Sequence, residues 1–309
     1  PLSHTPREQG VAPPPAGPLP EEKRTKRIRQ TKTMGCQTSK ENPFRTETYD
    51  AEQKTLNAVY PGAMTTHAFS DYVKKTLGKH GFTKESCLCA VSSCPDELNR
   101  GLDSMEDAWG ESFNLGGLAG MPFTGKTGFG AFSHHVPDGG QLLVVFAPHV
   151  GITKDGELGK IQRVGMAKNT TSCGSCMAAY GAACKKKEVC QEIKEKKADD
   201  EGIVGDVQQE KMLAVVSARI DEINACEDDT AKIAKLSDIV YEAIKKEILA
   251  IIPDDCAVPV AIVGGIQINT DYTSKTDFFH VRDVMLRSGP GKSFERIGGV
   301  EEKKAFTAA

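Results

Sequence analysis

The sequence has no hydrophobic run long enough to cross a bilayer, since its longest apolar stretches are residues 142–147 and 257–266. It also has little net charge, −3 from 39 basic and 42 acidic side chains, so nothing global indicates binding to nucleic acid or to a membrane surface. No internal repeat is seen. We therefore expect a soluble protein with no membrane insertion and no nucleic-acid partner.

The N-terminus lacks an apolar signal segment, and the first residue is Pro1 rather than methionine. The chain is therefore expected to be processed or truncated, with any targeting peptide outside the sequence in hand. Ten cysteines in such a chain are more typical of reduced thiols or metal ligands than of a secreted disulfide framework.

Three segments are predicted along the 309 residues. Residues 1–48 form a flexible arm, because the Pro-rich stretch APPPAGPLP and the basic run at 21–33 cannot bury enough apolar surface to order themselves. Residues 49–290 form a single domain, for which the 39% hydrophobic composition supplies a core. Residues 291–309 form an irregular tail.

Two apolar runs are predicted to be buried strands that end in polar or thiol side chains. QLLVVF at 141–146 leads to His149, and CLCAVSS at 87–93 leads to Cys94. Ligands bind beyond the carboxyl ends of strands in open α/β sheets, so both residues are candidates for a site. The other predicted elements are strands at 257–268 and 277–287, helices at 64–79, 207–224 and 230–250, and a long glycine-rich loop at 110–141.

Cys94, His149 and Cys173 form the first candidate site. Two thiolates and one imidazole are a ligand set that a catalytic zinc uses, with the fourth tetrahedral position left for water. Cys173 opens a predicted helix, whose dipole favours the thiolate form. The alternative is that these are two ordinary buried thiols and a loop histidine, and the long spacings between them do not decide between the two.

Cys173 and Cys176 also form a CxxC pair, which Cys184 and Cys190 follow. Four thiols could hold a structural zinc or an iron–sulfur cluster, and two could carry out thiol–disulfide exchange. The spacing of Cys184 and Cys190 is unlike a second CxxC, which argues against a closed four-thiol site.

Asp96 and Arg100 follow Cys94 and would share one face of a helix, where a salt bridge forms easily. Beside a metal-bound water, a carboxylate held by an arginine could accept the water's proton in a hydrogen bond. His134 and His135 are adjacent, so in an extended segment one could line the site; the alternative is two loop histidines.

Residues 120–127, GMPFTGKT, match the P-loop pattern GxxxxGK[ST], which needs a strand before it and a helix immediately after it. The following GFGAFSHHVPDGG is too glycine-rich to be predicted as that helix. We therefore do not expect nucleotide binding.

CPDELNR, GKTGFGAFSHHVPDGG, FAPHVGI and CGSC, in this order, resemble the limiting-CO₂-inducible B family of algal proteins, whose relatives include θ-type carbonic anhydrases. The resemblance covers roughly residues 50–290. It implies an α/β fold with a central mixed β-sheet flanked by helices, similar to β-class carbonic anhydrases. It also implies Cys94, His149 and Cys173 as zinc ligands, with Asp96 and Arg100 as a polar dyad. We further expect a narrow pocket lined by residues of the glycine-rich loop, namely Phe129, Phe132 and His135.

The function that the resemblance implies is zinc-dependent carbonic anhydrase activity, the reversible hydration of CO₂ to bicarbonate within a CO₂-concentrating mechanism. The expected partners are CO₂, bicarbonate and further subunits, as a homodimer, a higher oligomer or a hetero-oligomer with a paralogue. The expected location is the chloroplast, in the stroma, the pyrenoid region or the thylakoid lumen. The alternatives are a catalytically silent sensing or barrier component of an assembly, or a CxxC redox protein.

Overall fold

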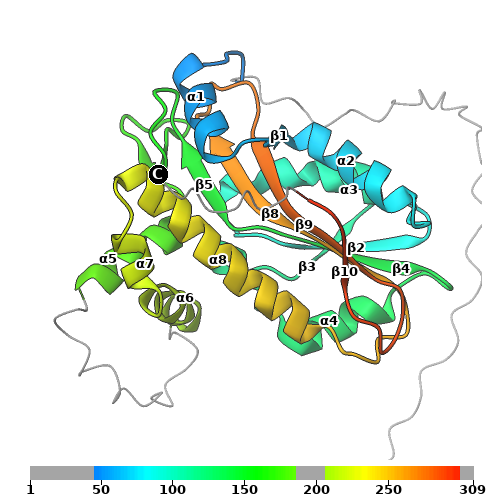
Figure 1. Cartoon of the computed structure of the whole chain (residues 1–309). Coiled ribbons are helices and arrows are strands. Elements are labelled where there is room, and N and C mark those ends of the chain that lie inside the picture. The colour runs from blue at the N-terminus through cyan, green and yellow to red at the C-terminus, as the bar shows by residue number, and fades with distance from the viewer. Residues whose placement is uncertain (1–44, 186–205, 300–309) are drawn as a thin grey trace, which may run out of the picture. The chain divides into compact units, whose positions relative to one another are not determined.

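The structure, a computed structural model, describes residues 45–185 and 206–299 (Figure 1). The predicted arm at 1–48 and the last ten residues of the predicted tail, 300–309, therefore lie almost wholly outside the described residues, as does Cys190. In the described part the tail is not irregular throughout, because Glu295–Gly298 form a strand that pairs with Phe278–Arg287.

One mixed β-sheet forms the centre of the described chain. Its strands are β1 (Met64–Thr65), β2 (Cys87–Ser92), β3 (Ser112–Asn114), β4 (Gln141–Phe146), β5 (His149–Ile152), β8 (Val260–Thr270), β9 (Phe278–Arg287) and β10 (Glu295–Gly298). The order is β1-β9-β8-β4-β2-β3, with β10 also paired to β9 and β5 to β8. Strands β2, β3, β4, β5 and β8 are parallel, whereas β9 runs antiparallel to β8.

Helices cover both faces of this sheet. One face packs against α1 (Asp50–Val59), α4 (Gly125–His134), α5 (Gly174–Lys185), α6 (Val207–Ser217), α7 (Ile220–Asn224) and α8 (Asp229–Ile251), and the other against α2 (Thr66–Gly78) and α3 (Ser104–Trp109). The remaining elements are the 3₁₀ helices η1 (Glu97–Asp103) and η2 (Leu118–Gly120) and the small sheet of β6 (Lys160–Ile161) and β7 (Thr170–Thr171). In Figure 1 the long helix α8 crosses one side of the sheet, and α2 and α3 lie on the other. The predicted fold class is confirmed.

The buried strands explain why helices are needed on both faces. Every residue of β8 is buried, as are five of the six residues of β4, so neither face of these strands can meet water. Helix α8 supplies an apolar stripe, and its first turn is capped by Asp228, whose carboxylate accepts a hydrogen bond from the Ala231 amide at 2.7 Å.

Two predicted segments differ from the structure. The supposed loop at 110–141 contains α4, in which the full burial of Phe129 and Phe132 against the sheet outweighs the weak helix propensity of three glycines. The strand that begins at Gln141 was expected to carry His149 at its carboxyl end, but β4 ends at Phe146. His149 instead begins β5, which pairs with β8.

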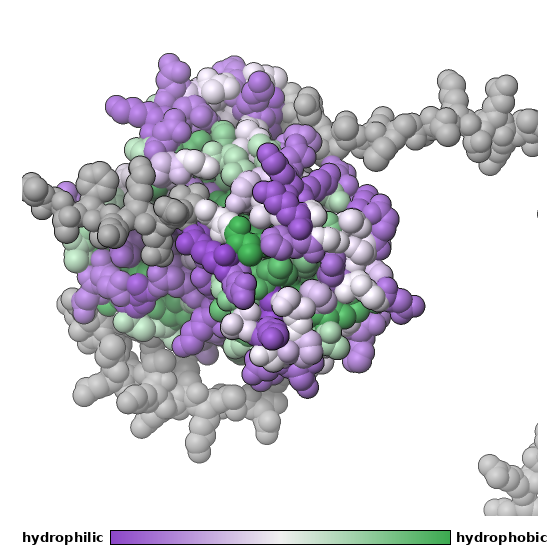
Figure 2. Space-filling model, turned by 45° about the vertical axis from the view of Figure 1, so that its right-hand side comes forward, coloured by the Kyte–Doolittle hydropathy of each residue, from purple (hydrophilic) through white to green (hydrophobic). Residues whose placement is uncertain are grey.

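The described surface is mainly polar. The face in Figure 2 is mostly hydrophilic, with small hydrophobic areas between the polar side chains. The exposed large hydrophobic side chains of the described residues are Val164, Met166 and Val207. None of the described helices is both long and apolar enough to span a membrane.

Candidate metal centre

Three predicted ligands come together at the carboxyl edge of the parallel strands. Cys94 lies two residues after β2, His149 is the first residue of β5, and Cys173 directly precedes α5. Strands β2 and β4 are parallel neighbours, so the segments that follow them leave the sheet at the same edge. All three residues are buried.

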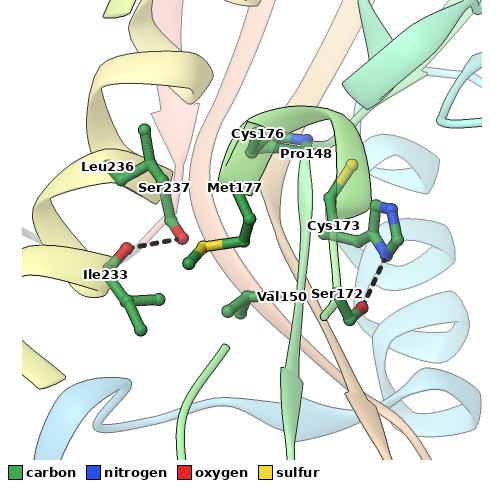
Figure 3. A pocket seen from close by; sticks show the side chains of 10 residues that line it. Pro148, Val150, Ser172, Cys173, Cys176, Met177, Ile233, Leu236 and Ser237 are labelled. Atoms are coloured by element: carbon green, nitrogen blue, oxygen red, sulfur yellow. Dashed lines mark hydrogen bonds between the residues drawn. The ribbon is translucent and has the colours of Figure 1, made fainter. Parts of the chain in front are cut away.

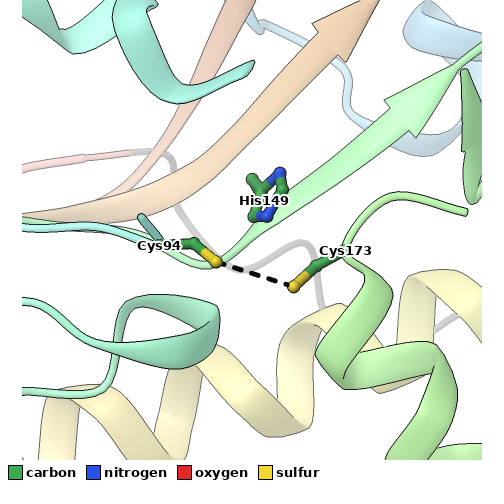
Figure 4. Close-up of side chains that lie close together, drawn as sticks. All are labelled: Cys94, His149 and Cys173. Carbon is green, nitrogen blue, oxygen red and sulfur yellow. Dashed lines mark hydrogen bonds between the residues drawn. The ribbon is translucent and has the colours of Figure 1, made fainter. Parts of the chain in front are cut away.

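The ligand atoms have the separations that one metal ion requires. The two Sγ atoms and one imidazole nitrogen all lie within 4.8 Å of one another, and the sulfurs are 4.0 Å apart (Figure 4). Two sulfurs bound to one tetrahedral zinc at 2.3 Å would be about 3.8 Å apart. The cluster is therefore compatible with a metal site.

The hydrogen bonds of His149 leave one ring nitrogen for a metal. Nδ1 lies 2.8 Å from Oδ1 of Asn269 and 3.3 Å from Oγ of Ser172. Nε2 is buried and has no hydrogen-bond partner in the described chain. A ligating histidine is held in this way, with its other nitrogen donating to an oxygen acceptor. The unpartnered Nε2 therefore fits a metal ligand.

The two thiols are poor acids in the absence of a metal. Contact with the Cys173 thiol and burial raise the pKa of Cys94, and contact with the Cys176 thiol together with burial raises that of Cys173. A metal ion would reverse this, because a coordinating thiol is deprotonated outright.

Asp96 beside the cluster has an unexpected partner. Its two carboxylate oxygens accept hydrogen bonds from Nη1 and Nη2 of Arg163, at 3.0 and 3.1 Å. Arg163 lies 67 residues further along the chain, in the connection between β6 and β7, and also bonds to Glu97 and Thr170. Arg100 was predicted as this partner; it lies in η1, but its side chain is outside the described part.

This pairing keeps Asp96 ionised. Burial raises the pKa of the carboxyl, but the hydrogen bonds from Arg163, together with smaller effects of Glu97, His149 and the Leu98 amide, outweigh it and hold the pKa at about 2. Oδ2 of Asp96 lies 3.9 Å from Nε2 of His149. Asp96 does not belong to the group of atoms within 4.8 Å of one another, so it is a neighbour of the cluster rather than a fourth member.

The other sequence candidates lie apart from the cluster. His135 ends α4 and is exposed, as is His134. The chain enters β4 soon after His135 and reaches the metal ligands only beyond the far end of β4, so the structure does not bring His135 to the site. Phe129 and Phe132 belong to the core and do not line it.

The additional cysteines do not complete a four-thiol site in the described chain. Cys176 is buried on α5 but is not in the group of ligand atoms around Cys94. Cys184 is exposed two turns further along the same helix. This geometry does not support a structural zinc or iron–sulfur cluster of Cys173, Cys176 and Cys184.

The P-loop match does not describe a nucleotide site, although a helix does follow it. Our sequence argument against that helix was wrong, since α4 begins at Gly125. The pattern also needs a strand directly before the loop, and β3 ends at Asn114, with η2 between it and Gly125.

A small cavity lies behind the cluster (Figure 3). Its volume of about 10 Å³ is the room that one water molecule needs. The lining residues on the side away from the ligands are mainly apolar and come from β5, α5 and α8: Val150, Met177, Ile233 and Leu236.

Comparison with known families identifies the chain. The profile of a family described as limiting CO₂-inducible proteins B/C, beta carbonic anhydrases, matches residues 63–288. The chain belongs to this family. The match includes all three clustered ligands, Asp96 and Arg163. The resemblance drawn from the short motifs is thereby confirmed.

Two solved structures of this kind are similar over most of the chain. The crystal structure of PtLCIB4, a homolog of the limiting CO₂-inducible protein LCIB, has 30% identity and a TM-score of 0.70, over 79% of this chain and 99% of that one. The crystal structure of LCIB itself has 20% identity and a TM-score of 0.55, over 79% and 97%, and shows the fold alone. A search of curated proteins gives no match.

Proposed function

We propose that this protein is a zinc-dependent carbonic anhydrase that interconverts CO₂ and bicarbonate. The observation that carries the proposal is the buried cluster of Cys94, His149 and Cys173, with Nε2 of His149 unpartnered, in a chain of this family. Two thiolates and an imidazole are a ligand set of catalytic zinc, which keeps a fourth position open.

Zinc, when bound, lowers the pKa of water toward about 7 and so supplies a nucleophile for CO₂ near neutral pH. The chain's own groups prepare the site for this chemistry. Asn269 holds His149 through Nδ1, which leaves Nε2 as the ring nitrogen that would bind zinc. Asp96 is ionised and held at both oxygens by Arg163, so it can accept a hydrogen bond from the attacking water and orient it.

The proposal for the biological setting rests on the family resemblance. We propose a role in a CO₂-concentrating mechanism, in a chloroplast, by subunits that associate as dimers or larger oligomers. The description of the matching family, limiting CO₂-inducible proteins B/C, supports the proposed role in a CO₂-concentrating mechanism. Fluorescence microscopy of the tagged full-length protein tests the location, and light scattering tests the association.

CO₂ hydration by purified protein of measured zinc content tests the enzyme. We expect about one zinc per subunit and activity in the wild type. Cys94→Ala and His149→Ala should lose both zinc and activity. Cys184→Ala is the matched control, because it removes an exposed thiol outside the cluster and should retain both. Circular dichroism establishes that each variant is folded.

The outcomes separate the candidate functions. Zinc without hydration activity would leave a sensing or barrier role in an assembly as the better explanation. Full activity in either ligand variant would show that the ligand set is wrong. A metal-free protein with two thiols that exchange with a disulfide would favour the redox alternative at Cys173 and Cys176.

A further inference from the structure

Gln267 is a buried amide with no hydrogen-bond partner. It lies in β8, is 0% exposed, and pairs in register with His149 of β5. Neither Oε1 nor Nε2 of its side chain has a partner in the described chain. Buried side-chain polar atoms almost always have one, so this amide calls for an explanation.

The side chain lies on the face of the sheet that carries the metal ligand. Residues paired in parallel strands point to the same face, and so do residues two apart in one strand. Gln267 is paired with His149, and two residues later Asn269 bonds to Nδ1 of that histidine. The three polar side chains therefore share one face. The 3₁₀ helix η1 lies over it, since Asn269 also donates to the carbonyl of Leu98 at 2.9 Å.

A second amide near the cluster is only partly satisfied. Asn99 donates to the carbonyl of Cys94 at 2.9 Å, but its Oδ1 is buried without a partner. His149, Gln267 and Asn99 each have an unpartnered polar atom; His149 and Cys94 are members of the cluster, Gln267 pairs with His149, and Asn99 bonds to Cys94. A leucine or methionine at position 267 would avoid the cost of an unpaired buried amide, so packing does not account for glutamine there.

We propose that the carboxamide of Gln267 binds bicarbonate. The inference rests on the proposed function, because bicarbonate is the product or substrate of that reaction. A carboxamide presents an N–H donor and a carbonyl acceptor side by side. Bicarbonate presents the complementary edge, with an oxygen that accepts and a hydroxyl that donates. Nε2 donates to the first and Oε1 accepts from the second, which a halide ion cannot match.

The test compares bicarbonate with iodide, an anion that has no proton to donate. Zinc-loaded wild type and Gln267→Met are titrated with each anion at one pH, and affinity is measured from the rise in melting temperature. We expect the dissociation constant for bicarbonate to rise about tenfold or more in the variant, as for loss of a paired hydrogen bond worth roughly 1.4 kcal/mol. The constant for iodide should stay the same. Without anion, Gln267→Met should melt at the same temperature or higher.

Ile266→Val is the control, because this neighbour is buried on the opposite face of β8 and its side chain belongs to the core. It should lower the melting temperature without changing either affinity. If Gln267→Met fails to fold, Gln267→Asn, shorter by one methylene, gives the same comparison.

Equal bicarbonate affinity in wild type and variant overturns the proposal, as does wild type that binds no bicarbonate. An equal loss of affinity for bicarbonate and for iodide also overturns the proposal, since the variant would then have disturbed the metal centre. Hydration by the wild type is measured separately. If the wild type is active and Gln267→Met does not change bicarbonate affinity, Gln267 does not bind bicarbonate but the proposed enzyme activity stands. If the wild type is inactive but its bicarbonate affinity depends on Gln267, the proposed enzyme activity is wrong and the bicarbonate-binding role of Gln267 stands.

Discussion

Asp96 and His149 are each held in place by a residue that is distant in sequence. Arg163 binds both oxygens of Asp96 from the β6–β7 connection, and Asn269 binds Nδ1 of His149 from the end of β8. Neither partner belongs to a short motif, because its position depends on how separate segments meet in the fold. The Arg163 contact should affect the rate of CO₂ hydration, whereas the Asn269 contact should affect zinc affinity.

Replacement of Arg163 by alanine should lower CO₂ hydration by about 10- to 100-fold, because Asp96 would lose the two side-chain hydrogen bonds from Arg163 and keep only the one from the Leu98 amide. Zinc content should not change, since neither residue is in the ligand group. Steady-state kinetics with metal analysis measures both quantities. Arg219→Ala is the matched control, since Arg219 forms a similar pair with Glu222 on the exposed surface of α7. Loss of zinc from Arg163→Ala would contradict this interpretation.

Replacement of Asn269 by alanine should lower zinc affinity by about 10- to 100-fold, the usual effect of removing a residue that orients a ligating histidine. Competition with a chromophoric chelator measures the affinity. Asn224→Ala removes an exposed amide on α7 and should leave the affinity unchanged. Equal affinities of Asn269→Ala and wild type would show that Ser172 alone suffices to hold the ring.

At the scale of elements, β4 and β8 pack closely because Phe146 of β4 is paired with a glycine of β8. Phe146 of β4 stacks on Tyr241 of α8 at 5.6 Å between ring centroids, and its ring lies over Gly264 of β8. A Cβ at Gly264 would be 2.2 Å from Cζ of Phe146, far inside van der Waals contact. Glycine is therefore required at this position so that the ring can pack against the strand.

Gly264→Ala should destabilise the fold by about 1–3 kcal/mol, as overpacking of a core does. Denaturant unfolding measures the change. A second substitution, Phe146→Leu, should make the effect of Gly264→Ala smaller, because it removes the ring that the new methyl group meets. Gly130→Ala in α4 is the control with the opposite sign. A Cβ there meets nothing within 4 Å, and alanine should stabilise the helix by up to about 1 kcal/mol.

The elements also show where sequence patterns succeed and fail. The runs at 87–93 and 141–146 and the periodicity of 230–250 predicted β2, β4 and α8 within a few residues, because buried elements carry a continuous or regular apolar pattern. The helix α4 was missed, since three glycines hide a pattern that is stabilised by the burial of Phe129 and Phe132.

At the scale of the whole molecule, burial of ionisable groups couples stability to pH. His280 of β9 is 3% exposed and donates from Nε2 to the carbonyl of Pro61, and its Nδ1 has no partner among the described residues. Burial, with a smaller effect of Arg282, lowers the pKa of His280 to about 4. The folded protein therefore disfavours the charged form of this histidine.

The sign of the effect follows from proton binding. Above about pH 6.5 His280 is neutral in both states and has no effect, whereas below it the unfolded chain binds a proton that the folded protein excludes down to about pH 4. Stability should therefore fall by about 3 kcal/mol between pH 7 and 4 from this residue. Urea unfolding of wild type and His280→Gln at several pH values measures the part of the pH dependence of stability that comes from His280. A constant difference between the two proteins across this range would refute it.

The sequence by itself determined the residues that can bind a metal and the strands that carry two of them. This was possible because a thiol, an imidazole or an apolar run can be recognised within a single segment of the chain. Only the tertiary structure decided that Cys94, His149 and Cys173 meet within 4.8 Å, that the distant Arg163 binds Asp96, and that Gln267 lies beside His149. These contacts depend on the register between strands and on loop paths across the sheet edge, which no local pattern encodes.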